Sequence, residues 1–199
     1  MNKIILKGII KDIQFSHYIP DTEYYKANII CKNNDKEDII PIKFKRFCNK
    51  YTEGQEIFIV GNIRTYSIKD EDGKNHVSPY VFTYLDTPQL EEDLDKTNFI
   101  SLDGNICKKG GLRKTKTGLD VLDFILANNI INNNQVFNTY IPVVAWGKEA
   151  KEISKMNIGD KLNIEGHFSS RTYKKPNKNG FDIKMAYEVN VDEIIKAIA

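Results

Sequence analysis

The chain has 199 residues, of which 41% are hydrophobic and 28% are charged, and this composition excludes a disordered protein. No run approaches the roughly 18 apolar residues of a membrane span, and the N-terminal sequence lacks the pattern of a signal peptide. The three cysteines (Cys31, Cys48 and Cys107) match neither a disulfide framework nor a zinc site, so we expect a reduced, cytoplasmic protein.

The formal net charge of +2 is divided unevenly between the two halves of the chain. Residues 1–95 carry 13 basic and 16 acidic side chains, whereas residues 96–199 carry 16 basic and 11 acidic ones. A positive second half suits a polyanionic partner, because phosphate contacts dominate the affinity of proteins for nucleic acids. Ordinary scatter of charge would give the same numbers, so charge alone does not show that the second half binds a polyanion.

The first half, residues 1–86, reads as five strands in chain order. Apolar, β-branched and aromatic residues concentrate at residues 4–10, 26–31, 38–44, 56–63 and 77–84. A short helical segment is expected at residues 46–51, between the third and fourth strands. Residues 87–97 then contain a proline and a run of acids, which predicts an extended linker.

The second half, residues 98–199, repeats the landmarks of the first in the same order. Residues 2–8 return at 98–104, residues 40–42 at 141–143, and residues 53–61 at 158–166. Strands are expected at residues 99–106, 121–127, 139–146, 161–168 and 183–191, with a helix at 149–155. Five strands with a helix between the third and the fourth describe the oligonucleotide-binding (OB) barrel. The sequence therefore predicts an all-β protein with short helices, made of two tandem five-stranded OB-fold barrels.

The second half resembles the bacterial and phage single-stranded DNA-binding protein family. The matching segments are residues 98–105 (NFISLDGN), 112–118 (LRKTKTG), 124–127 (FILA), 140–150 (YIPVVAWGKEA), 158–166 (IGDKLNIEG), 170–173 (SRTY) and 187–189 (YEV). The first half resembles the family more loosely, through residues 2–8 (NKIILKG), Gly54 and residues 61–65 (GNIRT). The resemblance implies sequence-independent binding of single-stranded DNA during replication, recombination, repair or mobile-element transfer.

Strand parity and the resemblance together select three aromatic side chains. Side chains of a strand alternate between its two faces, so Tyr140 and Trp146 share the face opposite the aliphatic residues between them. The family stacks bases on aromatics at the positions of Tyr140, Trp146 and Tyr173. The alternative is that these rings cap the core or fill a subunit interface.

Basic residues expected to contact phosphates lie in two loops of the second half and in the first barrel. OB folds bind oligonucleotides with the loops between strands 1 and 2 and between strands 4 and 5. The candidates in these loops are Arg113, Lys114, Lys116, Arg171, Lys174, Lys175 and Lys178. In the first half the aromatic platform is largely lost, since Ile39, Lys45 and Ile68 replace Tyr140, Trp146 and Tyr173. The remaining candidates there are Lys43, Lys45, Arg64 and Tyr66, and Tyr24, Tyr25 and Phe47 are further aromatic residues that would compensate.

No enzymatic activity, cofactor or metal is expected. The three histidines (His17, His76 and His167) are scattered, and no glycine-rich phosphate loop is present. Two alternatives stay open. One is an OB module that binds other proteins in a replication or conjugation complex. The other is RNA binding, because stacking does not distinguish the sugars.

The resemblance also bears on assembly. It implies that four barrels are presented to DNA. A chain with two barrels reaches this number as a homodimer, and this is the arrangement that we favour. The open edge of a first strand would pair across the two-fold axis. Alternatively, the two barrels pair with each other within one chain. The family's acidic C-terminal tail is not expected here, because residues 192–199 (DEIIKAIA) suggest a short helix starting at Asp192.

Overall fold

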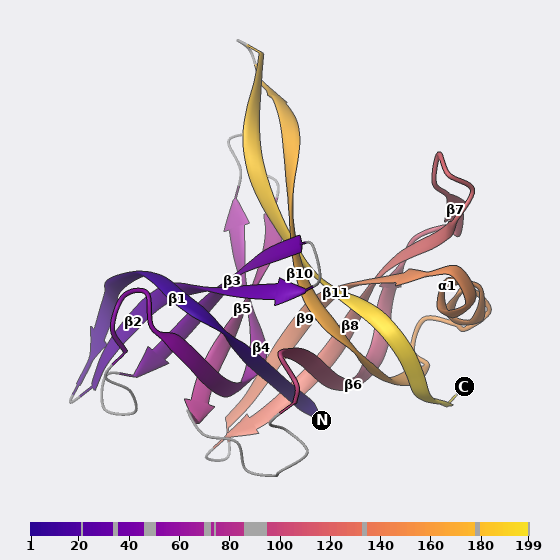
Figure 1. Ribbon diagram of the computed structural model, residues 1–199. Helices are drawn as coiled ribbons and strands as arrows, with labels where there is room; N and C mark the ends of the chain where they lie inside the picture. The colour runs from indigo at the N-terminus through magenta and orange to yellow at the C-terminus, as the bar shows by residue number, and fades with distance from the viewer. Residues whose placement is uncertain are drawn as a thin grey trace.

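Two β-barrels lie side by side in the computed structural model (Figure 1). The structure describes residues 1–20, 22–33, 36–45, 51–69, 73, 75–85, 95–132, 135–177 and 180–198. Within this part, all ten predicted strands are present, each extending further than the sequence indicated at one or both ends. The predicted linker lies largely outside the described residues, as does most of the helical segment expected at residues 46–51.

The first barrel closes in the strand order β1-β2-β3-β5-β4-β1. Its strands are β1 (Asn2–Ile19), β2 (Thr22–Asn33), β3 (Lys36–Lys45), β4 (Glu56–Lys69) and β5 (Asn75–Leu85). β3 and β5 run parallel, and the other neighbours run antiparallel. Alternate aliphatic side chains of β3 and β4, such as Ile40, Ile42 and Ile59, are buried in the core.

The second barrel has the same strand order, β6-β8-β9-β11-β10-β6. It consists of β6 (Asn98–Lys109), β8 (Asp120–Asn132), β9 (Gln135–Trp146), β10 (Lys161–Asn177) and β11 (Gly180–Ile198), with a two-residue strand β7 (Arg113–Lys114) paired to β8. Helix α1 (Gly147–Ser154) lies between the third and fourth barrel strands, as predicted, and buries Ala150 and Ile153. The predicted class, two tandem OB barrels, is therefore confirmed.

The C-terminal segment differs from the sequence prediction. The short helix expected from Asp192 is instead the end of β11, where Ile194 pairs with Ile164 and Ile198 pairs with Lys161. Ile194 packs against the core, whereas its neighbour Ile195 is exposed, as expected where successive side chains point to opposite faces of a strand. The free edge of β10 supplies a pairing partner that outweighs the local preference for helix. Among the described residues, no helix is long and apolar enough to cross a membrane.

Strands β1 and β6 pair with each other and join the two barrels into one continuous sheet. Ile4 pairs with Ile100, its own repeat equivalent, while Asn2 pairs with Leu102 and Leu6 pairs with Asn98. This register places a local two-fold axis at Ile4 and Ile100. Of the two arrangements that the sequence left open for these edges, the structure contains the pairing within one chain.

One asparagine in each barrel makes the same pair of hydrogen bonds to the backbone of the fourth strand. The Asn2 side chain donates to the Ile63 carbonyl (2.9 Å) and accepts from the Ile63 backbone N–H (2.8 Å). Asn98 makes the equivalent pair with Phe168, at 2.7 and 2.9 Å. Each pair of hydrogen bonds joins the first strand of a barrel to its fourth, so the duplication is visible in hydrogen bonds as well as in sequence.

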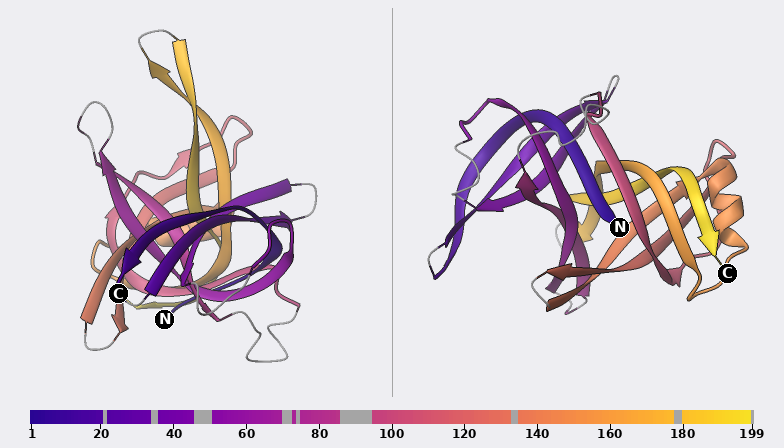
Figure 2. Two further views of the ribbon diagram at one scale, coloured as in Figure 1. Left: turned by 90° about the vertical axis from the view of Figure 1, so that its left-hand side faces the viewer. Right: turned by 90° about the horizontal axis from the view of Figure 1, so that it is seen from below.

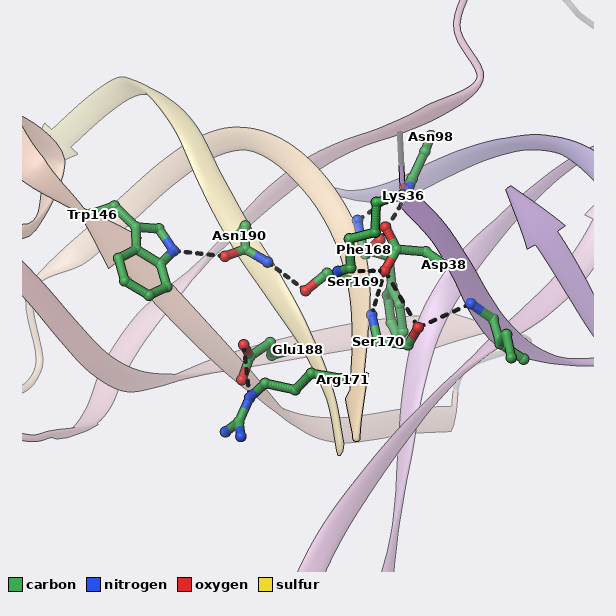
Figure 3. A network of polar contacts seen from close by, with 11 residues as sticks. Lys36, Asp38, Asn98, Trp146, Phe168, Ser169, Ser170, Arg171, Glu188 and Asn190 are labelled. Atoms are coloured by element: carbon green, nitrogen blue, oxygen red, sulfur yellow. Dashed lines mark hydrogen bonds and ion pairs between the residues drawn. The ribbon is translucent and has the colours of Figure 1, made fainter. Parts of the chain in front are cut away.

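A buried carboxylate makes a second link between the barrels. Asp38 of β3 is 1% exposed and accepts hydrogen bonds from the Ser170 backbone N–H (2.8 Å) and hydroxyl (3.3 Å) of β10. Ser170 Oγ in turn accepts from the Ile39 N–H (2.9 Å), and Lys36 pairs with Asp38 at 2.9 Å (Figure 3). A buried charge with this many partners fixes β3 against β10.

Candidate nucleic-acid interface

The predicted aromatic residues lie on the outer face of the second barrel. Tyr140 and Trp146 of β9 are 47% and 36% exposed, and the intervening Ile141, Val143 and Ala145 are buried, as strand parity predicted. Val144 shares the outward parity but is also buried, because it lies in a groove rather than on an open surface.

That groove, of about 260 Å³, crosses the face of the second barrel. Among the residues that line it are Val144 and Pro142 of β9, Lys108 of β6, Asp123 of β8 and Glu188 of β11. The groove has an apolar centre with charged side chains around it. This is the strand face on which OB folds hold oligonucleotides.

Tyr173 of β10 belongs to the same face. It is 38% exposed and lies four residues after Ser169, so the two share one side of the strand. Ser169 accepts a hydrogen bond from Asn190, whose side-chain oxygen accepts one from Trp146. Tyr140, Trp146 and Tyr173 therefore lie on the same side of the second barrel, on β9 and β10 with β11 between them.

Asn190 holds the ring of Trp146 in place. The indole Nε1–H of Trp146 donates to Asn190 Oδ1 at 2.7 Å, and Asn190 Nδ2–H donates to Ser169 Oγ (Figure 3). Asn190 is 9% exposed, so these bonds form out of bulk water. Sequence reasoning missed this residue. Its signal was an amide between two valines, Val189 and Val191, of the fifth strand.

The basic residues of the β10–β11 hairpin divide between its two sides. Arg171 lies on the aromatic side, where it pairs with Glu188 (3.3 Å) and has its guanidinium carbon 6.0 Å from the centre of the Tyr173 ring. Lys175 shares that side by parity. Lys174 lies on the opposite side with its ammonium 4.2 Å from the centre of the Phe181 ring, so it is separated from Tyr173. Lys178 lies outside the described residues.

The basic residues of the loop after β6 are partly neutralised. Arg113 pairs with Asp123, and Lys114 pairs with Asp120 at 3.0 Å. The hydrogen bond from Lys114 is the main cause that lowers the pKa of Asp120, so the Asp120 carboxylate stays charged at neutral pH. Lys116 is exposed in the turn that follows β7. Phosphate contact from Arg113 or Lys114 would compete with these ion pairs.

The face of the first barrel that corresponds to this aromatic face carries a lysine and an arginine side chain, and aromatic rings lie against both. The Lys43 ammonium lies 4.5 Å from the centre of the Tyr80 ring and 5.2 Å from that of Tyr66, and Arg64 lies 3.9 Å above Phe82. Burial is the main cause that lowers the pKa of both Lys43 and Arg64. A groove of about 270 Å³ is lined by Lys43, Tyr66 and Tyr80, among others.

Sequence reasoning missed two aromatic residues of this face, Tyr80 and Phe82. Their signal was alternation on β5, where both flank the buried Val81. Two of the aromatic residues expected to compensate for the lost platform are described. The ring centre of Tyr24 lies 6.3 Å from that of Phe82, and the Tyr24 ring stacks on His17. Tyr25 packs against the core residue Phe44. Phe47 lies outside the described residues. Lys45 is exposed at the end of β3, opposite Tyr24.

The comparisons with known proteins agree with the geometry. The model of the single-strand binding protein family matches residues 97–196. The chain belongs to this family. The structure of the wild-type single-stranded DNA-binding protein from Thermus aquaticus aligns with a TM-score of 0.71 and 17% identity, covering 98% of this chain and 92% of that chain. A deletion mutant of the Thermus protein aligns at 0.70 and 18%, covering 100% and 95%. No curated protein matches the chain.

At these identities the Thermus structures establish a shared fold over both barrels. The match to the single-strand binding protein family covers the second barrel, where Tyr140, Trp146 and Tyr173 lie. The first barrel lies outside the matched residues. Its equivalent face differs, because Lys43 and Arg64 lie against its aromatic rings. Among the described residues, no group of three or more His, Cys, Asp or Glu side chains is placed to hold a metal ion.

Proposed function

We propose that this member of the single-strand binding protein family binds single-stranded DNA without reading its sequence and without modifying it chemically. The observation that carries the proposal is the surface of three exposed aromatic side chains, Tyr140, Trp146 and Tyr173, on one face of an OB barrel. A cytoplasmic role in replication, recombination, repair or mobile-element transfer is part of the proposal.

Stacking explains why such a surface prefers single strands without preferring a sequence. Every base has a π-face, and a stacked base contributes roughly 1–3 kcal/mol. In a duplex these faces are covered by neighbouring base pairs, so the rings have nothing to stack on. The basic residues of the β10–β11 hairpin then contact phosphates, and release of counterions makes binding weaken with salt.

Fluorescence titration of Trp146, the only tryptophan, tests the proposal directly. We expect quenching by oligo(dT), an affinity that falls between low and high salt, and weak binding of duplex DNA. Oligo(U) in the same assay measures any preference for DNA over RNA. Replacing Tyr173 with leucine should weaken binding at least about fivefold, the equivalent of one lost stacking contact of about 1 kcal/mol. Equal affinity for duplex and single strands would contradict the proposal.

Assembly into a homodimer is part of the same proposal, because four barrels would then act on one DNA. The pairing of β1 with β6 occupies the edges first considered for self-association, so a second copy has to use another surface. Light scattering at micromolar concentration is expected to give the mass of two chains. The mass of one chain, with DNA binding intact, would refute the dimer.

A further inference from the structure

The groove of the first barrel, of about 270 Å³, lies in the same place of the repeat as the groove of the second barrel. Pro41 lines the first groove, and its repeat equivalent Pro142 lines the second. The side chains around these prolines nevertheless differ in charge. Asp12 lines the first groove, whereas Lys108, which follows it at the repeat interval of the first strands, lines the second. A carboxylate therefore stands where the other barrel has an ammonium group.

The difference in charge extends to the second and third strands of the barrels. Lys26 pairs in register with Lys43 in the first barrel, and at the corresponding positions of the second barrel Asp123 pairs with Val144. Lys26 and Lys43 both line the first groove. Burial, and after it the charge of Lys26, lowers the pKa of Lys43, so the two ammonium groups are close enough to interact. The two grooves thus offer different patterns of hydrogen-bond donors and acceptors to a ligand.

The backbone of β1 holds Asp12 at the wall of the first groove. Asp12 has a φ of 58°, and among the described residues other than glycine it is the one with a positive φ. It lies in a bulge, where the pairing of β1 with β2 shifts between Lys11 and Gln14. The Glu53 carboxylate accepts hydrogen bonds from the N–H groups of Asp12 (3.0 Å) and Ile13 (3.3 Å), which stabilises this conformation. A bulge bends its strand, and Figure 2 shows β1 bending around the first barrel after it leaves β6.

The side chain of Asp12 is oriented as well, and it keeps the capacity to accept further hydrogen bonds. Its Oδ2 accepts one from Asn28 Nδ2–H at 3.0 Å, and Asn28 also lines the groove. A carboxylate offers about four acceptor sites, so the bond to Asn28 leaves room for a ligand. The first groove therefore combines an oriented acceptor with the two lysine donors.

Guanine is the base of DNA whose edges match this combination. Its N1–H and its 2-amino group are adjacent donors that one carboxylate accepts together, and its O6 and N7 are acceptors to which a lysine donates. Adenine and cytosine present an amino group without a neighbouring N–H, and thymine presents an N–H without an amino group. These edges are accessible in an unpaired strand, whereas base pairing covers the donors of guanine in a duplex.

We propose that the groove of the first barrel binds one guanine of the bound single strand and that Asp12 selects this base. The Asp12 carboxylate accepts from N1–H and the 2-amino group, while Lys26 and Lys43 donate to acceptor atoms of the base and to its phosphate. Tyr66 and Tyr80 line the same groove and supply apolar surface for the ring. The inference rests on the proposed function and deepens it, because stacking on the second barrel accepts every base and the first groove adds a preference at one nucleotide.

A comparison of guanine with hypoxanthine tests the role of the carboxylate, because hypoxanthine differs from guanine only in lacking the 2-amino group. Two oligo(dT) strands of about 30 nucleotides, long enough to cover both OB folds, carry either deoxyguanosine or deoxyinosine at regular intervals, so that a purine reaches the groove in any register. Anisotropy of the labelled strands measures the affinities. We expect the wild type to bind the guanine strand at least about fivefold more tightly, as for a base read by a bidentate pair.

Asp12→Asn is the test variant. Asparagine tolerates a positive φ, so the bulge is kept while the carboxylate becomes an amide. The ratio of the two affinities should then fall below about twofold, because the paired acceptor is lost. The matched control is Glu37→Gln, which removes one negative charge from an exposed position of β3 outside the groove and should keep the wild-type ratio. A ratio that survives Asp12→Asn, or that falls equally in Glu37→Gln, would overturn the inference.

The wild-type protein alone gives a second test that does not depend on the folding of a variant. Equal affinities of the wild type for the guanine and hypoxanthine strands would overturn the inference, whatever Asp12→Asn does. Plain oligo(dT) in the same assay keeps this failure apart from failure of the proposed function. A wild type that does not bind oligo(dT) contradicts the proposed function, whereas one that binds it and does not distinguish the two purines contradicts only the guanine site.

Discussion

At the residue scale, equivalent positions of the two barrels carry different chemistry. Arg64 and Tyr66 of β4 correspond through the repeat to Ser169 and Arg171 of β10. In the first barrel the faces of Phe82, Tyr66 and Tyr80 are occupied by cations of the chain itself. Tyr140, Trp146 and Tyr173 of the second barrel are 47%, 36% and 38% exposed, so we expect stacking there and phosphate contacts in the first barrel.

Asn190 is expected to act on DNA through Trp146. Replacing Asn190 with valine removes the bond to the indole and leaves Ser169 without its donor, so we expect DNA affinity to fall by about threefold to tenfold, in line with a hydrogen bond of about 1 kcal/mol. Anisotropy of a labelled oligonucleotide measures the affinity without relying on tryptophan.

A double-mutant cycle separates this role from a structural one. In a Trp146→Phe background no indole N–H is present, so Asn190→Val should have little further effect on affinity. If the valine substitution costs the same in both backgrounds, Asn190 does not act through Trp146. A shift of tryptophan emission in free Asn190→Val protein is a second readout of the broken bond.

Cys31 makes stability depend on pH. Burial, with a smaller effect of the Asp38 charge, raises the pKa of Cys31 from 9.0 to about 12. The thiol stays protonated in the folded state while the unfolded chain ionises. The contribution of the thiol to the free energy of unfolding is complete below about pH 9. It is lost as the pH rises toward 12, by roughly 1.4 kcal/mol per pH unit.

Urea unfolding at about pH 8 and about pH 10.5 measures this effect, with Cys31→Ala as the reference. Lysines and tyrosines titrate in both proteins, so the difference between them isolates the thiol. The wild type should lose more unfolding free energy than the variant over this interval. Parallel losses in the two proteins would show that Cys31 is not the titrating group.

At the element scale, one glycine in each barrel allows the fourth and fifth strands to approach closely. Gly61 and Gly166 occupy the same repeat position, beside a register shift of the ladder. A Cβ atom at Gly61 would lie 2.5 Å from the Phe82 carbonyl oxygen, and one at Gly166 would lie 2.0 Å from that of Asn190. Neither carbonyl can move without breaking the barrel.

Gly166→Ala is therefore expected to lower the free energy of unfolding by about 1–3 kcal/mol through overpacking. The control is Gly111→Ala, in the loop before β7, where an added Cβ meets nothing within 4 Å. Urea unfolding of both variants, followed by Trp146 fluorescence, makes the comparison. Equal stability of the two variants would mean that the strands can move apart at no cost.

At the scale of the whole molecule, the two barrels are expected to unfold as one unit. A continuous sheet crosses the β1–β6 joint, and one buried cluster includes core residues of both barrels. Trp146 reports only on the second barrel, and Cys31, buried in the first, reports on that barrel through its accessibility to a thiol reagent. The two probes should give the same urea midpoint.

Asp38→Ala is expected to weaken this coupling, since it removes the bonds to Ser170 and leaves Lys36 without that carboxylate. We expect a loss of about 2–4 kcal/mol, whereas Glu37→Ala, on the exposed neighbour, should change stability by less than about 0.5 kcal/mol. Separate midpoints for the two probes in the wild type would show that the barrels are independent.

The sequence by itself determined the duplication, the two OB barrels, the family and the inward and outward faces of β9. These follow from local information, because strand periodicity and turn residues act over a few positions and the repeat can be seen in the order of its landmarks. The boundaries of the two domains and the roles of the site residues stay predictions.

Only the tertiary structure decided which groups meet across the chain. The bond of Trp146 to Asn190 joins residues 44 positions apart, and that of Asp38 to Ser170 joins residues 132 positions apart. The pairing of β1 with β6, the cations over the rings of the first barrel and the change of Asp192 from expected helix to strand are of the same kind. Each depends on how two distant segments come into register when the barrels close, and a local pattern carries no information about that register.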